Sequence, residues 1–167
     1  INQTMMRIDL PKVLKKGEKF VFKIDWNYNI PNRMAMGGRG GYEYFPEDGN
    51  DLYTITQWFP RMCVYSDFKG WQNNQFTGRG EFALAFGDYK VTMNVPADHI
   101  VASTGVGKNF EQVLTPAQLQ RWKQAQTANE PLEIVTLEEA KKAEKNKSKQ
   151  RKTWVFEAEN VRDFAWT

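Results

Sequence analysis

Few side chains of this 167-residue chain are of the types that bind metals or act as nucleophiles. The chain contains one histidine, His99, and one cysteine, Cys63, far apart in the sequence. Zinc sites take several His, Cys or carboxylate ligands, and catalytic Ser-His-Asp or Cys-His groups depend on a positioned histidine. We therefore predict no catalytic residue and no metal site in this chain. His99 is interpreted as a polar turn residue and Cys63 as a small buried apolar one.

The composition is typical of a folded domain with a substantial core. Hydrophobic residues make up 41% of the chain and aromatic residues 14%, and aromatic side chains bury large areas. No run of about 18 apolar residues occurs, so we expect no membrane span.

The formal charge of +3 is concentrated in one segment. Residues 141–152, "KKAEKNKSKQRK", hold seven basic residues and one acidic residue. Charge runs are usually exposed to solvent, and this one offers few apolar side chains whose burial would order it. We therefore expect 141–151 to be a charged mobile segment and predict no nucleic-acid partner.

Alternation of apolar and polar residues runs through much of the first hundred residues. In "FVFKIDWNYN" (20–29) and in "MMRIDL" (5–10), every second residue from Phe20 and from Met6 is apolar. This period is typical of half-buried strands. It predicts two strands, with Trp26 in the core.

The segment "EFALAFGDYKVTMNVP" (81–96) predicts a hairpin. Phe82 and Phe86 share a face before the Gly87-Asp88 turn, and Pro96 ends the second strand because proline cannot donate to a ladder. Further strands are expected at 100–104, stopped by Gly105, and at 153–158, with Trp154, Phe156 and Ala158 on one side.

Two helices follow from their N-terminal signals. Thr115 precedes Pro116, and Gln118 stands three residues after the cap, which is the pattern of a capping box. Thr136 and Glu139 repeat the device. The sequence therefore predicts helices at about 116–128 and 137–146.

Together these elements predict a mainly β fold with one or two peripheral helices, in a single domain over residues 1–167. Two classes of function remain for such a chain without catalytic residues. One is a β-sandwich that acts alone in ligand binding or adhesion. The other is a domain of a larger enzyme that shapes the substrate site.

Three stretches of the chain bear on this choice. They are "TITQWFPRMCVYSD" (54–67), "GEFALAFGDYKVTMNVPADHIVASTG" (80–105) and "AENVRDFAWT" (158–167). In this order they resemble three parts of the N-terminal domain of aminopeptidase N-family zinc metallopeptidases. The first is similar to the segment where a Thr-Gln pair precedes an aromatic-Pro and acidic pattern. The second is similar to the hairpin that follows, and the third to the strand that enters the catalytic domain.

The resemblance implies an antiparallel, saddle-like sheet or sandwich that covers a thermolysin-like catalytic domain. The family's zinc motif, H-E-x-x-H, does not occur here, so this chain is expected to be a non-catalytic N-terminal domain excised from a zinc aminopeptidase. No cofactor is expected in this chain, and zinc is expected in the absent catalytic domain.

The expected partners are that catalytic domain and a peptide substrate, and the chain is expected to be a monomer. A periplasmic or secreted location fits many similar proteins, although no residue of the chain indicates a compartment.

The resemblance also implies two substrate-binding residues. In the family, the glutamine of the Thr-Gln pair helps line the pocket for the first substrate residue, near its free α-amine. By position that glutamine is Gln57, whose carbonyl can accept a hydrogen bond from an ammonium group. The family often has an acid or an amide two residues later, where this chain has Phe59, so altered specificity is implied.

Overall fold

The computed structural model describes residues 1–78 and 83–167, and their contacts divide into two compact units. Unit 1 comprises Ile1–Ile30 and Pro60–Ala85, and unit 2 comprises Pro31–Phe59 and Phe86–Thr167. Each unit is therefore assembled from two separate stretches of the chain.

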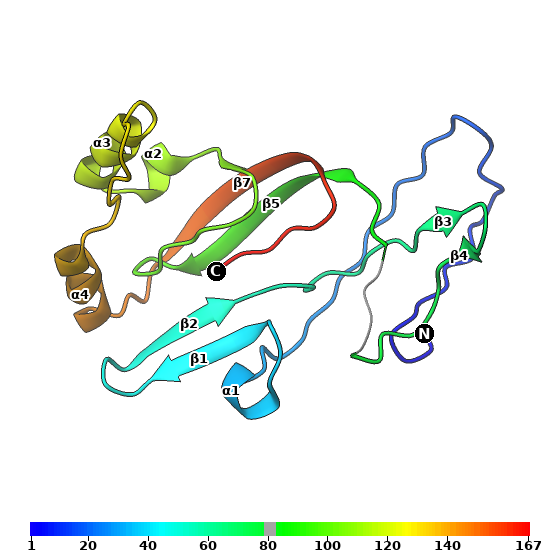
Figure 1. The fold of residues 1–167 in the computed structure, drawn as a ribbon, viewed down its shortest axis with the longest axis horizontal. Coiled ribbons are helices and arrows are strands. Elements are labelled where there is room, and N and C mark those ends of the chain that lie inside the picture. The colour runs from blue at the N-terminus through cyan, green and yellow to red at the C-terminus, as the bar shows by residue number, and fades with distance from the viewer. Residues whose placement is uncertain (79–82) are drawn as a thin grey trace. The chain divides into compact units, whose positions relative to one another are not determined.

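The largest sheet of unit 2 has three antiparallel strands in the order β5-β7-β6. Figure 1 shows its two long strands, β5 and β7, side by side. Their bounds are Gly87–Pro96 for β5, Val106–Gly107 for β6 and Arg151–Val161 for β7. The alternating pattern predicted for 153–158 is confirmed, because Trp154, Phe156 and Ala158 are all buried. Strand β5 ends at Pro96, as the sequence predicts.

The core of unit 2 lies against this sheet. Trp154 is 1% exposed and Phe164 is fully buried. Val91 and Met93 of β5 join them, together with Val101 and Val113 from the connecting segments. Val91 and Met93 alternate along β5, and the buried residues Trp154, Phe156 and Ala158 alternate along β7. One face of the two long strands therefore supplies most of the core.

A second sheet in unit 2 is the hairpin of β1 (Gly41–Phe45) and β2 (Asn50–Thr54). It follows the short helix α1 (Arg33–Met36), whose N-cap Asn32 accepts from the amides of Met34 and Ala35. Gly41 has φ +144, and a Cβ there would lie 2.5 Å from the Pro31 carbonyl oxygen. Only glycine fits at this start of the hairpin.

Three more helices complete unit 2. They are α2 (Phe110–Val113), α3 (Pro116–Ala125) and α4 (Leu137–Lys145). Both predicted capping boxes are confirmed: Thr115 pairs with Gln118, and Thr136 pairs with Glu139. Each helix ends slightly earlier than the sequence predicts.

The last residues of the chain lie between two segments that are distant in sequence. Trp166 forms β-bridges to Ile55 and to Ser103, and Ala102 and Thr167 exchange backbone hydrogen bonds of 2.9 and 3.0 Å. The predicted strand at 100–104 is therefore wrong as a regular strand. It forms only a bridge to the C-terminal segment, and it leads into Gly105 with φ +88.

Unit 1 contains little regular structure. Its sheet is the short hairpin of β3 (Tyr65–Ser66) and β4 (Gly70–Trp71). The predicted strands at 5–10 and 20–29 are wrong, because neither segment forms a strand in the structure. Alternation makes a face apolar, but a strand also requires a hydrogen-bonded neighbour.

The predicted core position of Trp26 is wrong as well, since this side chain is 47% exposed. The predicted hairpin over 81–96 is also corrected, because residues 83–86 are not a strand and β5 pairs with β7 instead. Phe82 lies outside the described residues.

The coarse fold prediction agrees with the structure. Strand accounts for 26% of the chain and helix for 17%, in small antiparallel sheets with four helices in the described ranges. No helix among those residues is long and apolar enough to cross a membrane.

The basic segment joins α4 to β7. Residues 141–145 are helical and Arg151 begins the strand. Between them, the Lys147 ammonium donates to the Gly49 carbonyl at 2.7 Å, and the Ser148 amide donates to the Asp98 carboxylate at 3.2 Å. The mobility expected for 141–151 stays a prediction.

A matched pair of valines tests the assignment of the core. Val113 is 2% exposed and Val106 is 63% exposed. We expect Val113→Ala to lower the free energy of unfolding by about 1.5–3 kcal/mol, because it removes buried methyl groups and leaves a cavity. Val106→Ala should cost about 0.5 kcal/mol or less. Urea unfolding followed by far-UV circular dichroism measures both, and equal losses would contradict the core described above.

The capping glutamate of α4 predicts a dependence of stability on pH. The hydrogen bond from the Arg121 guanidinium, together with the Thr136 amide, lowers the pKa of Glu139 to about 2. Its stabilising effect is therefore complete above the ordinary glutamate pKa and is lost as the pH falls from about 4.5 toward 2.

Glu139→Gln keeps an amide that can still cap the helix but removes the charge that pairs with Arg121. We expect this variant to lose less stability than the parent between those pH values, as measured by urea unfolding at a series of pH values. A parallel loss in both proteins would exclude Glu139 as a source of the pH dependence.

Candidate functional site

Gln57 lies on the segment that follows β2, with its side chain exposed to solvent. Its backbone has φ +52, in the left-handed region that residues other than glycine seldom adopt. Its side chain makes no hydrogen bond to any described residue. The amide is thus available to a ligand, as the sequence-based hypothesis requires.

The neighbours of Gln57 explain why it is turned outward. Ile55 is buried and its backbone pairs with Trp166 in both directions. On the other side, the Trp58 indole donates to the Phe164 carbonyl at 2.9 Å. The chain is fixed on both sides of Gln57, and the left-handed residue between them makes the turn.

Phe59 occupies a different environment from Gln57. Its ring packs edge-on against Trp58 at 5.1 Å and against Tyr89 at 5.7 Å between ring centroids. Tyr89 in turn lies 6.0 Å from the ring of Phe164. Phe59 is therefore half-buried at the edge of the core of unit 2, whereas Gln57 faces solvent.

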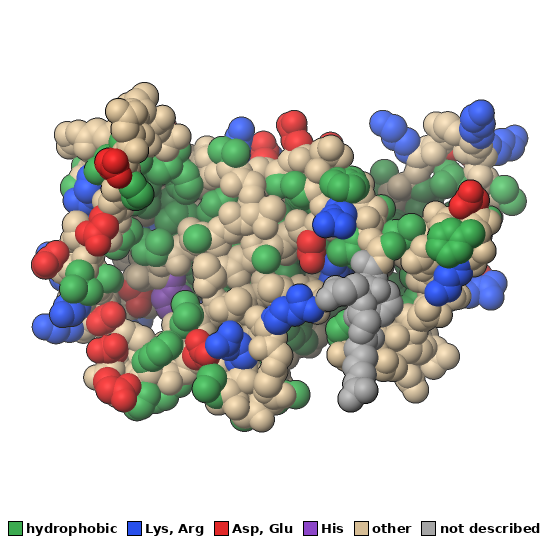
Figure 2. Space-filling view, viewed as in Figure 1, with side chains coloured by type: hydrophobic (Ala, Val, Ile, Leu, Met, Phe, Trp, Pro, Cys, Tyr) green, Lys and Arg blue, Asp and Glu red, His purple; other side chains and the backbone are tan. Residues whose placement is uncertain are grey.

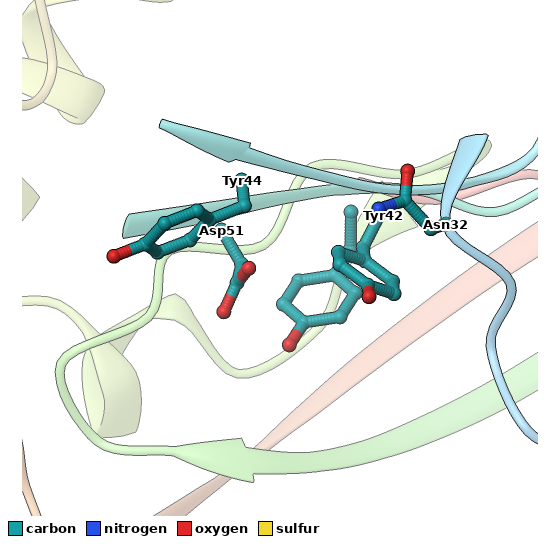
Figure 3. A pocket seen from close by; sticks show the side chains of 5 residues that line it. Asn32, Tyr42, Tyr44 and Asp51 are labelled. Carbon is teal, nitrogen blue, oxygen red and sulfur yellow. The ribbon is translucent and has the colours of Figure 1, made fainter. Parts of the chain in front are cut away.

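A pocket that the sequence analysis did not identify lies on the β1–β2 hairpin (Figure 3). It has a volume of about 430 Å³ and is lined by Asn32, Tyr42, Tyr44, Asp51 and Tyr53. Tyr42 stands opposite Tyr53 in the hairpin, and Tyr44 stands opposite Asp51. The sequence signal for this pocket is the alternation within "YEY" and "DLY". It places the two tyrosines of β1 on one face of the hairpin, together with Asp51 and Tyr53 of β2.

Asp51 is the charged side chain among the residues that line this pocket. Burial is the main cause that raises the pKa of Tyr53, and the nearby Asp51 and Tyr42 raise it further. Tyr53 is therefore a neutral phenol at physiological pH. Figure 2 shows acidic and hydrophobic side chains next to one another over this hairpin.

His99 and Cys63 lie in different units. The His99 ring is 6.2 Å from that of Tyr53, beside the pocket in unit 2. Cys63 is half-buried in unit 1. No group of three or more His, Cys, Asp or Glu side chains among the described residues is placed to hold a metal ion.

No protein-family model, curated protein or solved structure matches the chain.

Gln57 and Gln118 form a matched pair for testing whether Gln57 is structural. Gln118 is buried and closes the capping box of α3. We expect Gln118→Ala to lower the free energy of unfolding by about 1 kcal/mol, and Gln57→Ala to change it by less than about 0.5 kcal/mol. Gln57→Gly should leave it unchanged or raise it by up to about 1 kcal/mol, because glycine accepts φ > 0 without strain.

Urea unfolding of the three variants and the parent gives these values. If Gln57→Ala is as destabilising as Gln118→Ala, Gln57 is a structural amide and the available side chain described above is wrong.

Proposed function

We propose that this chain is the non-catalytic, saddle-like N-terminal domain of a zinc aminopeptidase. In this proposal it covers the catalytic domain and helps form the pocket for the first residue of a peptide substrate. Zinc and the catalytic residues belong to the catalytic domain of the longer protein. The proposal rests on the resemblance of three stretches to that family.

One observation supports treating the parts of the three stretches that belong to unit 2 as one domain. The first contributes Trp58 and Phe59, the second Tyr89 and the third Phe164, and these four rings pack in a continuous series. The Trp58–Phe164 hydrogen bond adds a direct link between the first and third stretches. Segments far apart in sequence thus depend on one another for burial.

Gln57 is the residue of this domain that we propose to contact the substrate. Anchored neighbours hold its backbone, its side chain is exposed, and strained backbone conformations of this kind are enriched at binding and catalytic sites. Its carbonyl can accept from the substrate α-ammonium. Phe59 would contribute indirectly, because its packing against Trp58 and Tyr89 holds the segment that carries Gln57.

The alternative is a β-rich module that binds a ligand without any catalytic domain. The tyrosine-lined pocket on the β1–β2 hairpin favours it, because aromatic and polar side chains converge there in unit 2. In that case the isolated chain is the complete functional unit. The two proposals differ in what the complete gene product does.

Expression of the complete gene product tests the first proposal. We expect it to contain one zinc ion and to hydrolyse aminoacyl reporter substrates, whereas the 167-residue chain alone does not. Gln57→Ala should lower kcat/KM for peptides with a free amine by about 10- to 100-fold, since it removes a hydrogen bond to a charged group. Any turnover of N-blocked peptides should be unaffected.

Gln120→Ala is the matched control, because Gln120 is an exposed amide on α3. It should leave kcat/KM unchanged for both substrate classes. A complete product without peptidase activity would refute the proposal. Equal losses for free and blocked peptides would remove Gln57 from amine recognition while leaving the domain assignment intact.

A further inference from the structure

We propose that the pocket on the β1–β2 hairpin binds an organic cation through a compact ammonium group. This inference does not rest on the aminopeptidase proposal, because Gln57 does not line the pocket, and it deepens the alternative of a ligand-binding module. It rests on the arrangement of the pocket-lining side chains and on their unused hydrogen-bonding groups.

The hairpin register brings the lining residues together. Tyr42 pairs with Tyr53, and Tyr44 pairs with Asp51, so alternate positions of both strands meet on one face. The Tyr42 and Tyr53 rings are 6.4 Å apart and tilted by 44°. Figure 3 shows the rings of Tyr42 and Tyr44 and the carboxylate of Asp51 extending from the same side of the hairpin. A ligand on this face would therefore contact both aromatic rings and a carboxylate.

The polar groups of this face are not used within the described protein. The carboxylate of Asp51 and the hydroxyls of Tyr42, Tyr44 and Tyr53 form no hydrogen bond or ion pair with any described residue. Asn32 is different, since its oxygen already accepts from two amides of α1. It can offer only its amide nitrogen as a donor.

The charge of the pocket selects the class of ligand. Arg33 of α1 pairs with Glu43, which points to the opposite face of the hairpin. Asp51 forms no ion pair with any described residue, so the pocket face keeps its negative charge. An anion would be repelled there, whereas an ammonium group is attracted both by the carboxylate and by the negative faces of the rings.

The size of the pocket agrees with a small cationic group. Its volume of about 430 Å³ is within the range of small-ligand sites. Burial is the main cause that raises the pKa of Tyr53 above that of an ordinary tyrosine, so its hydroxyl is protonated and can act as both donor and acceptor. Such a group can belong to a free amine, to the N-terminus of a peptide or to a lysine side chain.

Titration of the chain with tetramethylammonium chloride tests the proposal. With ¹³C-labelled tyrosine rings, we expect saturable NMR shifts for Tyr42, Tyr44 and Tyr53, and none for Tyr65 in unit 1. Sodium chloride at equal ionic strength and neopentyl alcohol, a neutral compound of similar shape, should not reproduce them. Alanine amide and Nα-acetyl-lysine amide then distinguish an α-ammonium from a side-chain ammonium source.

Two matched charge variants make the test specific. Asp51→Asn should weaken binding of tetramethylammonium by roughly three- to tenfold, while Asp48→Asn in the hairpin turn should have less than a twofold effect. Tyr44→Ala should weaken binding by roughly two- to fivefold, and Tyr44 is exposed enough for this change to leave the fold intact.

Three outcomes would overturn the proposal. They are equal effects of the two aspartate variants, equal shifts with neopentyl alcohol, and shifts with methyl glucoside in the absence of any response to cations. The last outcome would make the pocket a sugar site. None of them bears on the aminopeptidase proposal, which is tested by activity of the complete gene product.

Discussion

The antiparallel pairing of β5 with β7 is the contact on which unit 2 depends. These strands are separated by more than fifty residues in sequence. Their ladder runs from Gly87 opposite Val161, with a register shift before Tyr89, to Pro96 opposite Arg151. The connection between them carries α2, α3 and α4. Closing so long a loop costs entropy, which burial of one shared apolar face must offset. Trp154 and Phe156 provide much of that burial.

The C-terminal segment is placed by the same core. Phe164 is fully buried beneath the sheet, and the residues that follow it pair with Ile55 and with Ala102. Trp58 donates its indole proton to the Phe164 backbone. The position of Gln57 therefore depends on contacts between the segment that contains it and the C-terminal segment of the chain. Its outward side chain is a result of tertiary structure rather than of its immediate neighbours alone.

The β1–β2 hairpin carries different chemistry on its two faces. Glu43 pairs with Arg33 on one face, while the tyrosines and Asp51 gather on the other. Because neighbouring strand residues point in opposite directions, a single short hairpin can use one face for its own support and leave the other to a ligand. Gly41 permits this arrangement by letting the chain pass close to Pro31.

The sequence by itself determined the features that depend on local chemistry. The capping boxes at Thr115 and Thr136 were predictable because cap and partner are three residues apart. The buried face of β7 was predictable because apolar residues occupy every second position of "TWVFEA", and alternate residues of a strand lie on the same face. The same alternation also places the tyrosines of the pocket on one face of each strand. It does not specify the register of the hairpin, which decides which residues of the two strands stand opposite each other.

Tertiary structure decided the remainder. Residues 5–10 and 20–29 alternate as strands do, yet they form none, because a ladder needs a neighbour that no local pattern specifies. Residues 100–104 pair only with the end of the chain, and β5 pairs with β7 rather than with the segment before it. Local propensity fixes which face of a segment is apolar. Long-range burial and backbone hydrogen bonding decide whether that face finds a partner, and which one.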